Sequence, residues 1–125
     1  TVNRNDGYKD FTRGILHFKS MTETFDEVNY VDWNSPSGSF LWEIEDKLPK
    51  KGKINHYCIP PNIVNQIIMD RNAQKCNESL SRNIAIKRCN ADWIVSTNLD
   101  IITAVGISKL LIKLFGIKFK DLKKK

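Results

Sequence analysis

The sequence predicts an α/β domain built on a mainly parallel sheet with helices on both faces. Short apolar runs alternate with longer stretches whose apolar residues recur at helical spacing, which is typical of strands joined by helical crossovers. With 125 residues, 41% of them hydrophobic and 27% charged, the chain has the size and composition of one globular domain. We assign residues 1–116 to this domain and residues 117–125 to a basic, lysine-rich tail.

The first predicted elements are a strand, a helix and a second strand. Residues 1–4 form a short run before the turn residues Asp6-Gly7. Residues 8–21 place their apolar side chains near the spacing of one helix face. Residues 28–31 form a short apolar run that leads into polar residues, as a buried strand does at its end. The apolar positions of the helix are Phe11, Ile15, Phe18 and Met21.

The middle of the chain predicts a helix, a strand and a short helix. Residues 40–48 repeat apolar side chains at helical spacing and end at Pro49, which does not continue a helix. Residues 54–59 form a third apolar strand, and Pro60-Pro61 stops it. Residues 63–69 form a short apolar segment that favours a helix.

The last third predicts a helix, a fourth strand and a final helix. Residues 79–89 have an apolar side and begin near Ser79 or Ser81, either of which can cap the helix. Residues 93–97 predict a fourth strand that begins with three apolar residues, and residues 103–115 predict the last helix.

Three of the predicted strands end in polar side chains suited to a nucleoside diphosphate. Open parallel sheets bind ligands beyond the carboxyl ends of their strands. Arg4 supplies a cation after the first strand, and Asp32 supplies a carboxylate after the second. Asn98 and Asp100 follow the fourth strand and project to the same side of an extended segment. These residues predict a ligand site; the alternative is that they are ordinary polar residues at strand ends.

The order of these segments resembles a known family. Residues 82–101, RNIAIKRCNADWIVSTNLDI, resemble the core signature of GT-A fold (family 2-like) glycosyltransferases. That signature is a helix of type RNxGIxxA, a small-acidic-aromatic turn, an apolar strand and a D-x-D-like motif. The opening VNRND resembles the family's first strand, and VDWN at 31–34 resembles the acidic end of its second. The resemblance implies a Rossmann-like sheet, truncated to the nucleotide-sugar-binding half.

The resemblance also implies how a UDP- or GDP-sugar donor would be bound. Asp32 would contact the nucleotide base, and Arg4 would lie near the base or the ribose. Arg82 and Asn83 would face the nucleotide from their helix. The planar guanidinium of Arg82 suits pairing with a diphosphate.

The same resemblance implies a divalent cation, Mn²⁺ or Mg²⁺, after the fourth strand. Asp100 would bind the metal, and Asn98 would approach the ribose or the water shell of the metal. The metal would stabilise negative charge on the leaving nucleoside diphosphate. The first acid of the family's D-x-D pattern is Asn98 here, which removes one charge. Nothing after Asp100 resembles the family's general base, so the catalytic residue and the acceptor are unknown.

The net charge of +6 is concentrated near the C-terminus, which argues against nucleic acid as a partner. Residues 107–125 hold seven lysines and one acid, so residues 1–106 hold the other 13 basic and 13 acidic side chains. A protein that binds the phosphate backbone is expected to spread positive charge over a folded face. The apolar stripe of residues 107–114 predicts a core helix or, alternatively, contact with an anionic membrane surface.

The remaining observations predict a cytoplasmic protein, peripheral to a membrane if its tail binds one. Cys58, Cys76 and Cys89 form no CxxC pair, which fits reduced thiols and gives no zinc signature. His17 and His56 lie far apart without ligand spacing, so neither is expected to bind metal or to act in catalysis. Two hypotheses stay open: a sugar-transferring enzyme, and a non-catalytic remnant or binding module. An unpaired sheet edge would favour an oligomer.

Overall fold

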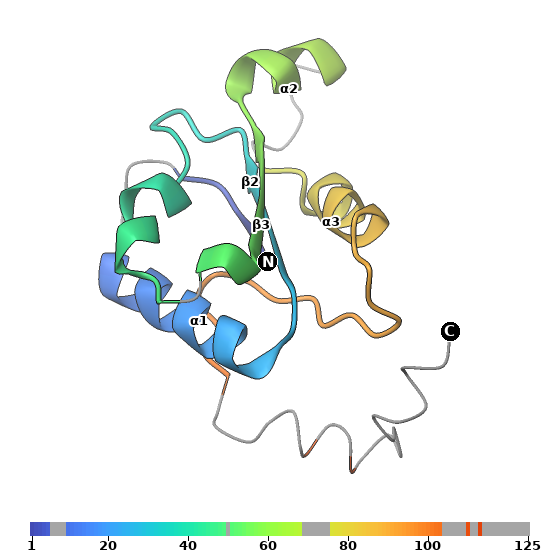
Figure 1. Ribbon diagram of the computed structural model, residues 1–125. Helices are drawn as coiled ribbons and strands as arrows, with labels where there is room; N and C mark the ends of the chain where they lie inside the picture. Colours follow the sequence, from blue (N-terminus) through green and yellow to red (C-terminus); the bar gives the residue numbers. More distant parts are fainter. Residues whose placement is uncertain (6–9, 50, 69–75, 104–109, 111–112, 114–125) are drawn as a thin grey trace.

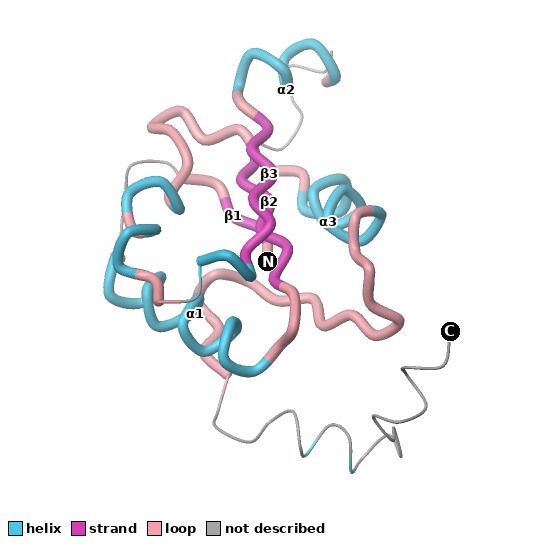
Figure 2. Tube along the Cα trace, viewed as in Figure 1, coloured by secondary structure: helices cyan, strands magenta, loops and turns pink. Residues whose placement is uncertain are grey.

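The computed structural model of the chain describes residues 1–5, 10–49, 51–68 and 76–103, together with Leu110 and Lys113. Within this part the fold is α/β, with a three-stranded parallel sheet and helices on both of its faces (Figure 1, Figure 2). The elements are β1 (Val2–Asn3), α1 (Phe11–Thr24), β2 (Val28–Trp33), β3 (Ile54–Ile59), α2 (Pro61–Ile67) and α3 (Glu78–Lys87), with 3-10 turns at Leu41–Glu43, Glu45–Lys47 and Lys51–Lys53.

The strand β2 is central and pairs in parallel with both β1 and β3. Its six residues lie opposite the six residues of β3, from Val28 opposite Ile54 to Trp33 opposite Ile59. Parallel strands need crossover connections; α1 supplies the first and the 3-10 turns supply the second. The predicted third strand is confirmed with the same bounds. The second strand runs two residues further than predicted, so Asp32 lies inside the sheet.

The two faces of the sheet carry different layers (Figure 1). On one face, α1 and the 3-10 turns cover β2, and the Phe18 ring meets the Tyr30 ring edge-on with centroids 5.1 Å apart. On the other face lies α3, and the Arg88 guanidinium just after it stands 5.4 Å from the centre of the Tyr57 ring. The buried core consists of Phe18, Met21, Val28, Tyr30, Phe40, Leu41, Ile44 and Leu48.

The predicted helix over residues 40–48 is wrong, although the four apolar residues that indicated it, Phe40, Leu41, Ile44 and Leu48, are all buried. The segment forms two short 3-10 turns, Leu41–Glu43 and Glu45–Lys47. Ile44 separates them because its backbone, at φ −125° and ψ −6°, leaves the helical region. In a 3-10 turn residues three apart lie above one another, so Leu41 and Ile44 reach the core together. The apolar spacing predicted burial correctly without fixing the type of helix.

The helix α3 is confirmed, but its cap differs from the prediction. Asn77 is the N-cap residue, and its side-chain oxygen accepts a hydrogen bond from the Leu80 backbone N–H at 2.9 Å. Asparagine is among the preferred N-cap residues because its oxygen reaches these free N–H groups. The Ser81 hydroxyl instead donates to the Asn77 carbonyl at 2.7 Å. The helix α2 begins earlier than predicted, at Pro61, whose fixed φ and missing N–H suit a first helical position.

The predicted fourth strand at residues 93–97 is wrong, although its position beside the sheet is preserved. A single parallel bridge joins Asn98 to Val2, on the edge of β1 that faces away from β2. Trp93, Ile94 and Val95 are about half exposed, at 59%, 47% and 50%. A strand with successive apolar residues, such as Trp93 to Val95, needs covering layers on both faces, and the described residues do not supply them here. The spatial order is therefore segment 93–98, β1, β2, β3.

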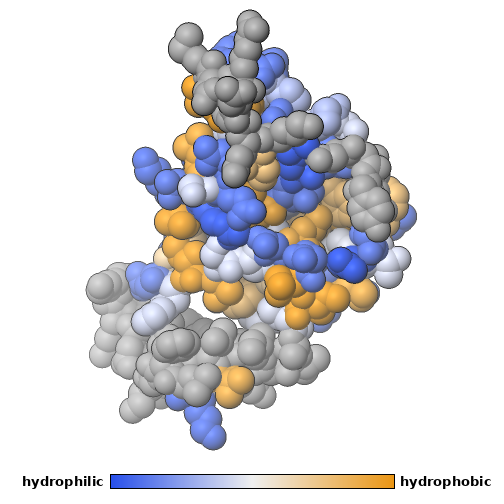
Figure 3. Space-filling model, turned by 180° about the vertical axis from the view of Figure 1, so that it is seen from behind, coloured by the Kyte–Doolittle hydropathy of each residue, from blue (hydrophilic) through white to orange (hydrophobic). Residues whose placement is uncertain are grey.

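The last predicted helix, at residues 103–115, and the tail at 117–125 lie outside the described residues apart from Thr103, Leu110 and Lys113. None of the described helices has the length and apolar content that crossing a bilayer requires. Hydrophobic residues nevertheless occupy a substantial part of the described surface on the face turned away in Figure 1 (Figure 3).

We expect Gly14→Ala to destabilise the fold. A Cβ atom at Gly14 would lie 2.6 Å from Cζ of the buried Phe40 ring and closer still to Cε1. Overpacking of this kind costs about 1–3 kcal/mol, which outweighs the ~1 kcal/mol by which alanine is favoured over glycine in a helix. Urea unfolding measures the difference. Gly52→Ala is the control, since a methyl group at Gly52 would have no atom within 4 Å; equal stability of both variants would contradict the close packing of α1 on Phe40.

Candidate functional site

A cavity of about 310 Å³ opens at the carboxyl ends of β1 and the 93–98 segment. Both α1 and α3 begin at this cavity, and the N-terminal ends of helices carry partial positive charge. The position agrees with the expectation that an open parallel sheet binds ligands beyond its strand ends. The cavity is lined by Val2, Asn3, Arg4, Asp10, Arg13, Gly14, Phe40, Cys76, Glu78, Asn98, Leu99 and Asp100.

Three of the predicted site residues line this cavity together: Arg4, Asn98 and Asp100. Arg4 follows β1 directly, and Asn98 is held beside β1 by its bridge to Val2. Asp100 lies in the turn after Asn98, which closes when the Ile101 N–H donates to the Asn98 carbonyl at 3.2 Å. Residues from opposite ends of the described chain thus meet in one place.

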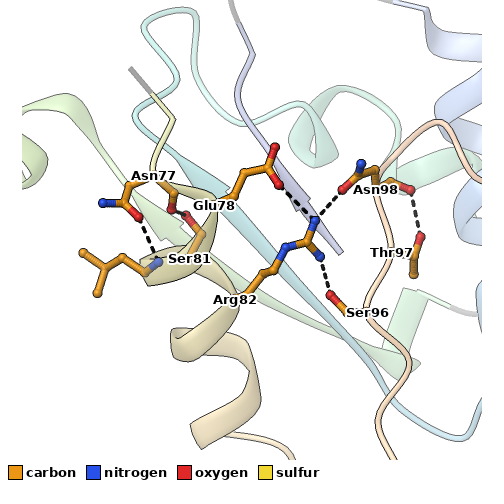
Figure 4. A network of polar contacts seen from close by, with 8 residues as sticks. Asn77, Glu78, Ser81, Arg82, Ser96, Thr97 and Asn98 are labelled. Carbon is orange, nitrogen blue, oxygen red and sulfur yellow. Dashed lines mark hydrogen bonds and ion pairs between the residues drawn. The ribbon is translucent and has the colours of Figure 1, made fainter. Parts of the chain in front are cut away.

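Arg82 reaches this group from α3 without lining the cavity (Figure 4). Its Nη2 donates to the Asn98 side-chain oxygen at 2.7 Å and to the Glu78 carboxylate at 3.1 Å. Its Nη1 donates to the Ser96 hydroxyl. The guanidinium therefore orients the Asn98 side chain, and an anion that approached Arg82 would compete with Glu78. Asn83 is exposed on α3 and is not among the cavity residues.

Asp32 does not line the cavity, contrary to the expectation that it would meet a nucleotide base there. The carboxylate is completely buried. Its Oδ2 accepts three hydrogen bonds, from the Tyr30 hydroxyl at 2.9 Å, the Ser39 hydroxyl at 3.1 Å and the Phe40 N–H at 3.3 Å. Its Oδ1 is buried without a hydrogen-bond partner among the described residues. Because β2 extends past the predicted end, Asp32 anchors the following loop instead.

The loop after β2 is closed over Asp32 by contacts to the end of β1. The Asn5 N–H donates to the Ser35 hydroxyl at 2.7 Å, and the Asn5 side-chain amide donates to the Gly38 carbonyl at 3.0 Å. Gly38 has a φ of 81°, a conformation that favours glycine. The loop is therefore held at two places. Asp32 accepts hydrogen bonds at Ser39 and Phe40, and Asn5 donates hydrogen bonds to Ser35 and Gly38.

A second contact joins Asp32 to His56 through Ser39. The Ser39 hydroxyl lies 2.8 Å from Nε2 of His56. Because the Asp32 carboxylate only accepts, the single hydroxyl proton of Ser39 goes to Asp32, and Nε2 of His56 must donate. Burial raises the pKa of Tyr30 far above its usual value, and the neighbouring Asp32 charge adds to the shift. This polar chain is internal to the fold and does not reach the cavity.

His17 is a residue whose structural importance the sequence analysis missed. It is fully buried on α1, with Nδ1 bonded to the Ile101 carbonyl and Nε2 lying 2.9 Å from the Thr1 hydroxyl. Its place on the helix was the available signal, since it lies on the buried stripe with Gly14, Phe18 and Met21. Burial lowers the pKa of His17, while its bond to Ile101 and the charge of Asp100 oppose that shift.

The acidic residues of the cavity differ in how they are engaged. Asp10 caps α1 by accepting from the Arg13 N–H at 2.9 Å, and Glu78 is paired with Arg82. Asp100 is exposed, and its carboxylate makes no hydrogen bond or ion pair within the described residues. It is therefore the cavity acid most available to a ligand.

The cavity residues fit a divalent cation only if oxygen atoms of a bound ligand also coordinate it. No group of three His, Cys, Asp or Glu side chains suited to a metal occurs within the described ranges. Magnesium is often bound by one or two carboxylates together with substrate phosphates and water. Asp100 alone meets the protein's part of that arrangement, since the Asn98 oxygen already accepts from Arg82.

Comparisons of the chain with protein-family models, curated proteins and solved structures found no match. No family is assigned to it on this basis. Its function has to be inferred from the cavity and the residues that line it.

We expect Asp32→Ala to destabilise the fold strongly, because it leaves two buried hydroxyls and a backbone N–H without their acceptor. The loss should be about 3 kcal/mol or more, given the cost of unsatisfied buried polar groups. Chemical unfolding checks it against Asp46→Ala, an exposed acid on a 3-10 turn, which should change stability by less than about 0.5 kcal/mol. A stable Asp32→Ala that loses only ligand binding would instead support the original expectation of a base contact.

Acidification is expected to weaken the fold through its two histidines. Burial lowers the pKa of both His17 and His56 in the folded chain. The unfolded chain, with an ordinary histidine pKa of about 6.5, therefore takes up protons that the folded chain refuses. The contribution of the two histidines is full above about pH 6.5 and falls as the pH drops through that value, by at most ~1.4 kcal/mol per pH unit for each histidine. Thermal unfolding between about pH 8 and 5 measures the slope, which His17→Asn should reduce; an unchanged slope would exclude His17 as a contributor.

Proposed function

We propose that this chain binds a nucleoside-diphosphate sugar together with Mn²⁺ or Mg²⁺, as the donor-binding part of a glycosyltransferase-like domain. The observation that carries the proposal is the meeting of Arg4, Asn98 and Asp100 in one cavity. The resemblance to GT-A fold glycosyltransferases implies that Arg4 lies near the base or ribose, that Asn98 approaches the ribose or the water shell of the metal, and that Asp100 binds the metal. They come from distant parts of the chain, so their meeting is not a consequence of sequence proximity.

The order of the strands supports the same ligand class. Segment 93–98, β1, β2 and β3 follow one another in space, the order that the 4-1-2-3 half of a Rossmann-like sheet would have, with a single bridge at Asn98 in the place of the fourth strand. Along the sequence, each strand is added further out from β1 to β3, and segment 93–98 then lies on the other side of β1. Nucleotides bind at such a switch point, between the first strand and its returning neighbour. The cavity lies at that place, beyond β1 and Asn98.

Two arginines and the N-terminal ends of two helices lie where a diphosphate would bind. Arg4 and Arg13 line the cavity, with Arg13 in an ion pair with Asp10 at 3.5 Å, and the helix ends add partial positive charge. Asp10, Glu78 and Asp100 also line it, so the binding of a diphosphate depends on a cation. Asp100 offers its carboxylate to a cation that the phosphates would also bind. When bound, that cation supplies Lewis-acid stabilisation of the negative charge on the leaving nucleoside diphosphate. Arg82 keeps the Asn98 side chain in a fixed orientation beside this place.

A non-catalytic nucleotide-binding module is the second candidate, and the engagement of the acidic residues favours it. Asp10 and Glu78 are occupied by Arg13 and Arg82. A general base needs a group free to take a proton near the reacting atoms, and the described part of the cavity offers Asp100 alone, which the metal would occupy. Membrane contact by the basic C-terminal region, oligomer formation and a cytoplasmic location stay predictions from the sequence.

Calorimetric titration with UDP and GDP, with and without Mn²⁺, tests the donor site. We expect the wild-type chain to bind one of them with Mn²⁺. Binding should weaken by at least ~10- to 100-fold when Mn²⁺ is left out, and by as much in Asp100→Ala. This is the loss of metal affinity that follows when a residue supporting a metal ligand is mutated. Asp46→Ala is the matched control, since Asp46 is exposed and is not among the cavity residues, and it should bind like wild type.

Two outcomes would contradict the proposal: a folded wild-type chain that binds neither nucleotide, or binding that is indifferent to Mn²⁺ and to Asp100. If donor binding is found, release of free sugar from UDP- and GDP-sugars separates the two candidates. Release that Asp100→Ala abolishes supports the enzyme, and tight binding without release supports the module.

A further inference from the structure

We infer that His17 is a positioning residue that holds the Asn98–Ile101 turn so that Asp100 faces the cavity. This inference rests on the proposed function, because it assigns His17 to the metal-binding side of the donor site. His17 does not line the cavity itself. It acts through the backbone of Ile101, the residue next to Asp100.

The tautomer of His17 follows from its two partners. The Ile101 carbonyl only accepts, so Nδ1 carries the proton and donates to it. Nε2 is then an acceptor and takes its hydrogen bond from the Thr1 hydroxyl, 2.9 Å away. The imidazole is fully buried, so neither bond is exchanged for water. His17 therefore joins α1 to the strand that leads into the cavity and to the turn that follows Asn98.

Two further side chains continue this line along α1. The Ser20 hydroxyl accepts from the Thr103 N–H at 3.2 Å, and the Thr24 hydroxyl lies 3.2 Å from the Thr103 hydroxyl. Positions 17, 20 and 24 share one side of a helix. The segment from Ile101 to Thr103 thus runs along that side of α1, and His17 is its contact nearest to the cavity.

Asp100 is fixed only through the two ends of its turn. At one end Asn98 is held by the bridge to Val2 and by Arg82. At the other end His17 holds Ile101. The Asp100 carboxylate makes no side-chain bond of its own within the described residues. Loss of the His17 contact would leave the turn attached at the Asn98 end, with Asp100 free to swing away from a bound metal.

A pair of amide variants separates positioning from general support of the fold. The side-chain nitrogen of His17→Asn takes the place of Nδ1 and keeps the bond to Ile101. That of His17→Gln takes the place of Nε2 and cannot reach Ile101; as a donor it can hydrogen-bond only to the oxygen of the Thr1 hydroxyl. We expect Mn²⁺ to strengthen UDP or GDP binding by His17→Asn nearly as much as in wild type. In His17→Gln the Mn²⁺-dependent gain should fall about tenfold, the effect of losing one buried hydrogen bond, while binding without Mn²⁺ stays the same.

Hydrogen exchange of the Ile101 amide gives a readout that does not depend on any ligand. This N–H closes the turn to the Asn98 carbonyl. Its exchange should be about tenfold faster in His17→Gln than in His17→Asn, because only the glutamine variant loses the bond to Ile101. Equal exchange in the two variants, or equal loss of binding with and without Mn²⁺, would overturn the inference and leave His17 a purely structural residue.

Titration of the wild-type chain beside the two His17 variants distinguishes loss of the donor site from loss of the positioning role of His17. If wild type binds no nucleotide, the proposed donor site is lost, and the role of His17 in aligning a metal ligand falls with it even if Ile101 exchange differs. If wild type binds with Mn²⁺ and the two variants behave alike, the donor site stands and His17 does not position it. Should neither variant fold, the ring-nitrogen NMR shifts of wild-type His17 decide: protonation at Nδ1 supports the inference, and protonation at Nε2 alone overturns it, because Nδ1 could then not donate to the Ile101 carbonyl.

Discussion

The short strand β1 is paired on both of its edges at Val2, and the arrangement of the sheet and the cavity depends on that double pairing. One edge of this short strand lies against Val31 of β2, and the other meets Asn98. The first contact joins β1 to the strand that carries most of the core. The second brings the described segment after α3 back to the sheet. It is this bridge, together with the imidazole of His17, that lets Arg4 and Asp100 share a cavity.

The polar groups of the molecule fall into two separate sets with different tasks. Asp32 and Ser39 are buried on the α1 side of the sheet and fix the loop after β2, with the half-buried His56 hydrogen-bonded to Ser39. Arg82 and Asn98 belong to an exposed set at the edge of the cavity, where solvent or a ligand can reach them. Burial makes the first set costly to change and useless for recognition. Exposure makes the second set weak in stabilising the fold and available for chemistry.

The sequence predicted the elements whose signals are local and missed those that depend on distant neighbours. The strand at 54–59 was predicted with the bounds that the structure has, since a short strand-forming stretch between turn residues and two prolines is a local signal. The run at 93–97 has the same signal, yet a strand also needs partners, and the sequence does not reveal that the described residues lack them. For the site, Arg4, Asn98 and Asp100 were predictable as polar residues after strands. Asp32 was misplaced because two extra residues of pairing with β3 drew it into the sheet.

The bridge between Val2 and Asn98 closes nearly the whole length of the described chain into a loop. Contacts between residues so far apart in sequence form late, because the chain must first give up the conformational freedom of everything between them. The crossover through α1 from β1 to β2 joins much nearer residues and needs no such closure. Within the described residues, we therefore expect the cavity to assemble after the β2–β3 core during folding and to open before it.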